Sequence, residues 1–449
     1  MFKRILGLLF ALGVAAAAVL LVEFSPTRVG QDTVPQAVTV QPKQPTLVCP
    51  GPVFVNGGQN GVTIGSFTQA GSVDAFGNDA GVAIMQTSND DIVLSGTAGG
   101  SKSFNAIQLQ SANGKQAFGL SGVNCVPGSN SAWLVAGDNT VGREALLVLA
   151  NPTAVDATVS LQLFGTSGPI QGSGLSGISA PAQKVTVLPL SSFAPKTETF
   201  AVQVSVRGAE LGIWLQQKTV RGLTPGGLDL VGVSAEPSQQ VLIPGIFLRG
   251  TSKLAALVSA DENFADTKPI LRVTAPGDKP AKFTAQIQGA DGSSFGNVLQ
   301  GDVPAGSTRD FDLVDLADGN YSVQINADVP VLASARYSRM SGTKPDFAWA
   351  QSVAPRKLNA GFTTASGATT KLSIANGNNK EAKVTVNGRE LTVTANSNLV
   401  YQVSDGISYT ITSNRSVAVS QVVDVRGGIA VIPVLDYRNV GGQLKITVR

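Results

Sequence analysis

The chain has 449 residues, too many for one small core, and its 50 glycines and 23 prolines predict several domains rich in turns. A charged fraction of 14% and a net charge of +3 argue against a nucleic-acid-binding surface. The sequence contains no histidine, which argues against Ser-His-Asp and Cys-His catalysis and against most zinc and copper sites.

Residues 1–24 predict a signal anchor that crosses the membrane once as a transmembrane helix. Lys3 and Arg4 precede Ile5–Val22, an uncharged run near the shortest length that spans the hydrocarbon core. Large residues follow this run where a signal peptidase needs small ones, so we expect an uncleaved segment; a cut near Ala16 is the alternative. The basic start then places the C-terminal region outside the cytoplasm, at the cell membrane.

A linker and a disulfide-tied module are predicted next. Residues 25–45 contain prolines at spacings that forbid a helix and favour an extended stalk. Residues 46–131 predict a β module containing Cys49 and Cys125, the only two cysteines. Outside the cytoplasm we expect them to form a disulfide, which would stabilise the module by roughly 4.5 kcal/mol on the chain-entropy estimate. Two buried free thiols are the alternative.

A passage that recurs three times predicts the remaining architecture. LLVLANPT at 146–153, ILRVTAPGD at 270–278 and LSIANGNN at 372–379 are each followed by a strand of period-two alternation. Later strands and a closing strand pair complete each copy.

The copies predict an all-β chain of tandem immunoglobulin-like β-sandwich domains, because each has about six or seven strands in roughly 100 residues. We place the repeats at 132–236, 237–345 and 346–449. A closed barrel or a propeller blade is the competing arrangement. We rank it lower because a blade normally has four strands in half the length.

One group of acidic residues is a candidate ligand site. Asp310 and Asp312 share a strand face, and Asp315 and Asp318 follow in the turn beyond. Carboxylates at this spacing could hold calcium, but calcium needs six or more converging oxygens, and a polar strand with a turn explains the pattern without a metal. We therefore expect no cofactor, and with no pair of facing carboxylates we expect no enzyme activity.

The three tryptophans, Trp133, Trp214 and Trp349, are the candidates for stacking on sugar rings. Trp133 and Trp349 stand at what we take to be corresponding places in repeats one and three. A tryptophan repeated in this way more often fills a core, so we expect burial. An exposed pair would favour glycan binding.

The short basic start with its single anchor, AWLVAG at 132–137, REALLVLANP at 143–152 and the later strand repeats together resemble an uncharacterised family. This domain of unknown function occurs in membrane-anchored extracytoplasmic proteins of high-GC Gram-positive bacteria. The resemblance implies an envelope location and supplies no catalytic residues. We expect a non-catalytic, membrane-tethered scaffold or accessory protein in cell-envelope assembly, whose partner is an envelope protein or wall glycan and not nucleic acid. A cell-wall glycan-binding module is the alternative.

Overall fold

The computed structural model describes residues 36–40, 46–56, 67–69, 73–77, 82–88, 91–98, 105–114, 117–290, 298–425, 428–437 and 444–448. The chain separates into two compact units, residues 1–43 with 440–449, and residues 44–439. In the first unit, β1 (Gln36–Val40) pairs antiparallel with β33 (Leu444–Val448), so part of the predicted linker is a paired strand. The predicted anchor, residues 1–24, lies outside the described residues. Within them, no helix has the length and apolar character needed to cross a bilayer.

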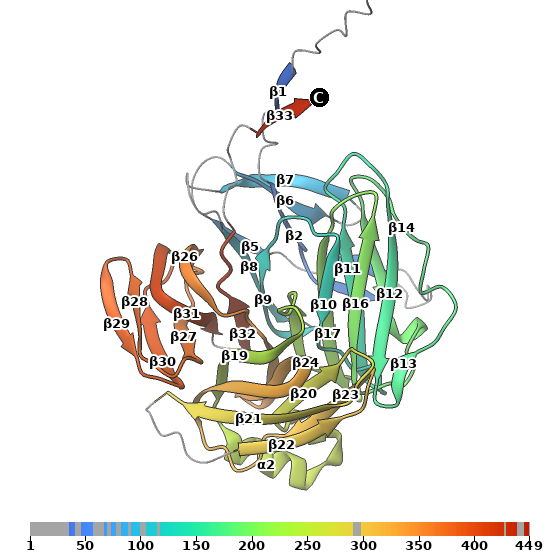
Figure 1. The fold of residues 1–449 in the computed structure, drawn as a ribbon. Helices are drawn as coiled ribbons and strands as arrows, with labels where there is room; N and C mark the ends of the chain where they lie inside the picture. The colour runs from blue at the N-terminus through green and yellow to red at the C-terminus, as the bar shows by residue number, and fades with distance from the viewer. Residues whose placement is uncertain are drawn as a thin grey trace, which may run out of the picture. The chain divides into compact units, whose positions relative to one another are not determined.

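The second unit contains three sandwiches of two sheets each (Figure 1). The first sandwich consists of β10 (Ser131–Leu134), β11 (Arg143–Ala150), β12 (Ala157–Gly165), β13 (Gly168–Ile170), β14 (Ile178–Ala180), β15 (Val185–Pro189), the short helix η1 (Leu190–Ser192), β16 (Phe200–Arg207), β17 (Gly212–Arg221) and β18 (Thr224–Val231). Its sheets have the orders β10-β16-β12-β13, with β14 also on β12, and β15-β11-β17-β18.

The second and third sandwiches repeat this order. The second consists of β19 (Ser238–Leu248), β20 (Ile270–Ala275), β21 (Ala281–Gly289), β22 (Val298–Val303), β23 (Ser307–Asp312), β24 (Gly319–Ser341) and β25 (Lys344–Gln351). The third consists of β26 (Arg356–Thr363), β27 (Thr369–Asn376), β28 (Ala382–Val386), β29 (Arg389–Val393), β30 (Ser397–Val403), β31 (Ser408–Val425) and β32 (Gly428–Pro433). The long strands β24 and β31 each cross from one sheet to the other, a path that β16 and β17 divide between them in the first sandwich.

Period-two alternation places the apolar side chains inside, as predicted. In β12, Val159, Leu161 and Leu163 are buried between the sheets, while Thr158, Ser160 and Gln162 face solvent. The all-β prediction and its two-sheet units are therefore confirmed.

Two finer details differ from the expectation. The boundary drawn between residues 345 and 346 falls inside β25, which pairs with β24 along its whole length and so belongs to the second sandwich. The first strand of each sandwich pairs with the sixth strand of the common order, as β10 does with β16. An immunoglobulin constant domain instead places its first and second strands side by side.

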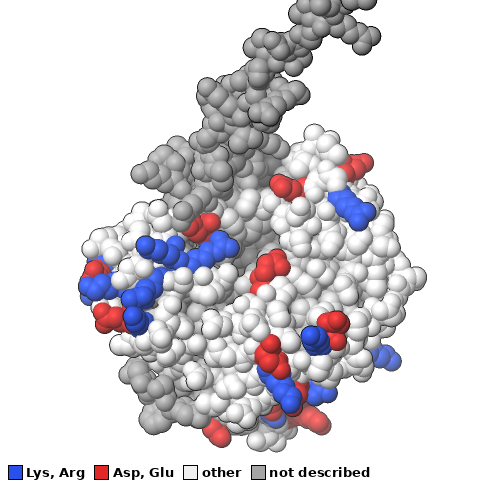
Figure 2. Space-filling model, viewed as in Figure 1, with Lys and Arg blue, Asp and Glu red and all other residues white. Residues whose placement is uncertain are grey.

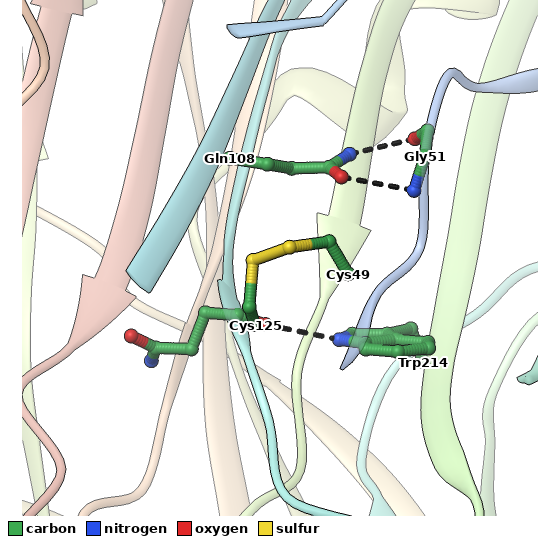
Figure 3. Close-up of a disulfide and its surroundings, with 6 residues drawn as sticks. Cys49, Gly51, Gln108, Cys125 and Trp214 are labelled. Atoms are coloured by element: carbon green, nitrogen blue, oxygen red, sulfur yellow. Dashed lines mark hydrogen bonds between the residues drawn. A yellow bond between two sulfur atoms is a disulfide. The ribbon is translucent and has the colours of Figure 1, made fainter. Parts of the chain in front are cut away.

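The N-terminal module is the part with the smallest sheets. It contains β2 (Thr46–Cys49), β3 (Phe54–Asn56), β4 (Phe67–Gln69), β5 (Asp74–Gly77), β6 (Val82–Ser88), β7 (Asp91–Ala98), β8 (Ala106–Asn113) and β9 (Phe118–Cys125), in the sheets β2-β6-β7, β3-β4 and β5-β8-β9. Figure 3 shows the Cys49–Cys125 disulfide, which confirms that prediction. Beside it the amide of Gln108 bonds both backbone groups of Gly51, at 2.9 and 2.6 Å, and the indole of Trp214 donates to the Asn124 carbonyl at 3.2 Å.

Inner strands from all four modules meet at one place. β9 lies against β18 and β32, and β25 lies against the same two strands, which closes a ring. Apolar clusters bridge neighbouring modules around it: Trp349 of β25 enters the first sandwich core, and Ile429 and Val431 of β32 enter that of the second. Sheets that pack face to face around inner strands resemble the blades of a propeller, the arrangement ranked lower from the sequence.

The centre of this ring, which we call the hub, is occupied by Asp346 of β25. Its buried carboxylate accepts backbone hydrogen bonds from Leu120 of β9 at 3.0 Å, Leu228 of β18 at 3.3 Å and Ile429 of β32 at 3.0 Å. The residues before these donors are all glycines. A Cβ at Gly119 would lie 2.2 Å from Asp346 Oδ1. One carboxylate thus ties together strands from the other three modules.

Candidate functional site

The second sandwich has an insertion that its two counterparts lack. The connection from β19 to β20 holds the helix α2 (Thr251–Ala260) and the short helix η2 (Glu262–Thr267). The equivalent connections, residues 135–142 and 364–368, contain no helix. An insertion in one copy of a repeated unit is where a specific function is most readily added.

A groove of about 510 Å³ lies between α2 and the segment after β23. The buried side chains of Leu248, Leu254 and Leu313 contribute to its apolar lining. The remaining lining residues are Thr251, Ala255, Val258, Ser259, Thr267, Lys268, Pro269, Asp312, Val314, Asp315, Leu316 and Ser338. Its volume is in the range of sites that bind small molecules or a few side chains of a partner.

α2 buries little of its own surface. Only Leu254 is fully buried, Leu257 and Val258 are half-buried, and Ala255 and Ala256 are exposed. A ten-residue helix is marginal in water without tertiary support. Contacts at its two ends must therefore hold it in place.

At the N-terminal end, Asp318 provides the cap. The residue preceding the helix is Gly250, which has no side chain to cap it and a φ of 77°. The Asp318 carboxylate accepts from the backbone N–H of Gly250 at 2.8 Å, and from the N–H and hydroxyl of Thr251 at 2.9 and 2.7 Å. The backbone hydrogen bonds from Gly250 and Thr251 lower the pKa of Asp318, as expected for a carboxylate at a helix N-terminus.

At the C-terminal end, Asp266 of η2 binds three arginines. Its carboxylate lies 2.6 Å from Arg221, 3.1 Å from Arg143 and 3.4 Å from Arg336. Burial alone would raise the pKa of Asp266, but the three guanidinium groups outweigh it and the pKa is lowered. Arg143 and Arg221 belong to the first sandwich, so this cluster fastens the insertion to its neighbour. Arg221 also stacks on Phe264, with 4.8 Å from Cζ to the ring centre.

The four predicted aspartates serve separate purposes. Asp310 forms an ion pair with Arg272 at 2.7 Å and accepts from the Thr199 hydroxyl at 2.8 Å. Asp318 caps α2, whereas Asp312 and Asp315 are exposed on the groove rim. Across the described part of the chain, no group of three or more His, Cys, Asp or Glu residues is placed to hold a metal ion.

The three tryptophans are buried. Trp133, Trp214 and Trp349 are 5%, 0% and 1% exposed, so none offers an indole face to a sugar ring. Trp133 lies in β10 and Trp349 in β25, so the two do not occupy equivalent strands. The Trp349 indole donates to Gln217 at 2.8 Å, and Arg272 stacks 4.7 Å from its ring centre. The tryptophans therefore stabilise the junctions between modules.

Sequence reasoning missed the insertion and the hub. The insertion had one signal: Asn151 and Ala275, equivalent positions in repeats one and two, lie farther apart in sequence than Ala275 and its counterpart Asn376. The hub had no comparable signal, because many of the 50 glycines are followed by an apolar residue and nothing local distinguishes Gly119, Gly227 and Gly428.

The fold and site define an all-β protein of four modules. One module carries the helix α2, which is held at both ends beside a groove. A model of DUF5719, a family of unknown function, matches residues 82–413, and the chain belongs to this family. The predicted resemblance to an uncharacterised family is thus confirmed, while the envelope location and bacterial group that it implied stay predictions.

Other comparisons add no function. No curated protein matches the sequence. An anti-sigma factor domain-containing protein from Clostridium clariflavum is similar at 7% identity, over 83% of this chain and 96% of that chain. Its TM-score of 0.13 carries no argument about this fold.

Proposed function

We propose that the protein is a non-catalytic, membrane-tethered extracytoplasmic scaffold in cell-envelope assembly, and that it binds a partner protein in the α2 groove. The observation that carries this proposal is the insertion, which is fastened at both ends and leaves beside it a groove whose apolar walls, Val258, Val314 and Leu316, are accessible. A core element would cover those walls. An open apolar groove held by fixed elements is instead typical of a binding site.

The extracytoplasmic placement is supported by the sequence and by the disulfide. Lys3 and Arg4 before an uncharged run favour a retained anchor with the folded part outside. The disulfide between Cys49 and Cys125 fits an oxidising compartment. We expect protease added to intact cells to degrade the folded part, and full protection in cells whose wall has been removed would contradict this placement.

The partner is tested by crosslinking in intact cells. The full-length protein and a Val258→Asp variant, which places a charge in the half-buried groove wall, are treated with a cleavable crosslinker and purified in detergent. We expect one protein to be captured by the natural chain and lost from the variant. Asn379→Asp, an exposed change in the third sandwich, serves as the matched control. Capture unaffected by Val258→Asp would refute the groove as the binding site.

A wall glycan is the second candidate partner. The basic residues on the surface of the third sandwich favour a glycan that is acidic. Figure 2 shows Lys and Arg gathering over the third sandwich. The exposed basic residues there outnumber the exposed acidic residues Glu381, Glu390 and Asp405, and they are Arg356, Lys357, Lys380, Lys383, Arg389 and Arg415. Lys383 is paired with Glu390 at 2.9 Å. Pull-down of the protein by purified wall glycan, abolished when Arg356 and Lys357 are changed to Gln, would support this role. Binding unchanged by these substitutions would remove it.

A further inference from the structure

We propose that the α2 groove takes a segment of a partner protein that carries large apolar side chains next to an arginine or lysine. This inference rests on the proposed function and adds the chemistry of the partner. It is drawn from the depth of the groove and from the charges on its rim.

The floor of the groove selects apolar side chains. The accessible carbon surface is that of Val314, which is 63% exposed, and of the half-buried Val258 and Leu316. Beneath them Leu248, Leu254 and Leu313, at most 6% exposed, form a closed apolar floor. Space of about 510 Å³ admits several large side chains but not a whole helix. Burial of such side chains releases water from both surfaces and supplies most of the binding free energy.

The rim adds a preference for positive charge. Asp312 and Asp315 are exposed on either side of Val314, itself 63% exposed, and neither carboxylate forms an ion pair with another described residue. Lys268 is the sole basic residue among those that line the groove. Two carboxylates against one ammonium leave the opening acidic, so an arginine or lysine beside the apolar anchor is favoured and an acidic residue is repelled.

The backbone turns sharply at one of these aspartates. Asp315 has a φ of 58°, the left-handed conformation, which aspartate tolerates better than most residues. The turn also exposes Val314 beside the groove. Acidic and apolar groups are thereby presented side by side, and the partner segment should mirror this arrangement.

Peptide display tests the inference directly. A random library of displayed peptides is selected on the full-length protein in detergent and, in parallel, on Val258→Asp. Peptides recovered only with the natural chain are then measured against Asp312→Asn/Asp315→Asn and against the control Asp278→Asn/Asp302→Asn, which removes the same charge from exposed sites outside the groove.

We expect the groove-dependent peptides to contain at least two large apolar residues and an arginine or lysine. Their affinity should fall roughly three- to tenfold in Asp312→Asn/Asp315→Asn and stay unchanged in the control. Groove-dependent peptides without basic residues, or with no response to this double variant, would overturn the charge preference and leave the proposed function standing. Recovery of no groove-dependent peptide would overturn both.

Discussion

Replacement of Asp346 by alanine tests whether the hub holds the modules together. The substitution leaves the backbone N–H groups of Leu120, Leu228 and Ile429 without their buried acceptor. A buried donor left unpaired costs about 1–3 kcal/mol, so the three together cost roughly 3–9 kcal/mol. The loss of the buried carboxylate returns part of this free energy, because burial disfavours its charged form.

The returned part depends on pH. Burial raises the pKa of Asp346 to about 7 despite the backbone hydrogen bonds that lower it. Since the folded pKa is above the ordinary value of 3.8, the folded protein holds the proton more tightly than the unfolded chain. Stability from this group is therefore fully present below about pH 4 and is lost as pH rises towards 7. As the pH rises from 5 to 8, ionisation of this carboxylate lowers the free energy of unfolding by roughly 2 to 3 kcal/mol.

We therefore expect Asp346→Ala to destabilise the protein by roughly 2 to 3 kcal/mol more at pH 5 than at pH 8. Burial raises the pKa of Asp229, a second buried carboxylate, and the charge of Asp346 raises it further, so both proteins are compared in an Asp229→Asn background. Urea unfolding followed by the fluorescence of the buried tryptophans measures the difference, with the exposed Asp312→Ala as control. A variant as stable as the natural protein at pH 5 would refute the role of the hub.

Three further predictions concern single elements of the fold. Gly119→Ala should destabilise the fold strongly, because its Cβ would lie 2.2 Å from Asp346 and its φ is 129°. The control Gly388→Ala has a φ of 83° but open space around it, and it should cost only about 1 kcal/mol in urea unfolding. Asp318→Ala should remove the cap of α2 at a cost of about 1 kcal/mol, seen as faster hydrogen exchange confined to residues 251–260; uniform exchange along the chain would contradict it. Replacing both Cys49 and Cys125 by serine should destabilise the N-terminal module by roughly 2–5 kcal/mol, and an unchanged urea midpoint would show that the disulfide is dispensable.

The sequence predicted the features that internal repeats and alternating hydrophobicity determine. Period-two patterns such as that of β12 predict strands with one buried face, as in two packed sheets, and the recurring passage predicts three copies of one unit. The disulfide was predictable because the chain has only two cysteines.

The packing of modules and the construction of the site were not predictable in this way. The ring depends on contacts such as that between Asp346 and Leu120, which are 226 positions apart, and no local pattern encodes such a pairing. α2 was missed because a helix that buries only Leu254 has almost no apolar periodicity. Asp310 and Asp318 were noticed as acidic residues, but their partners, Arg272 in β20 and Thr251 at the start of α2, are 38 and 67 positions away in the sequence.

The central claim, that the α2 groove binds a partner protein, is tested most directly by a photo-crosslinking residue placed in the groove of the full-length protein in living cells. Ser259 is exposed and lines the groove, and Asn379 is an exposed control position outside it. We predict that light produces one discrete protein adduct from position 259 and none from position 379. No adduct from position 259, or the same adduct from both positions, would contradict the claim.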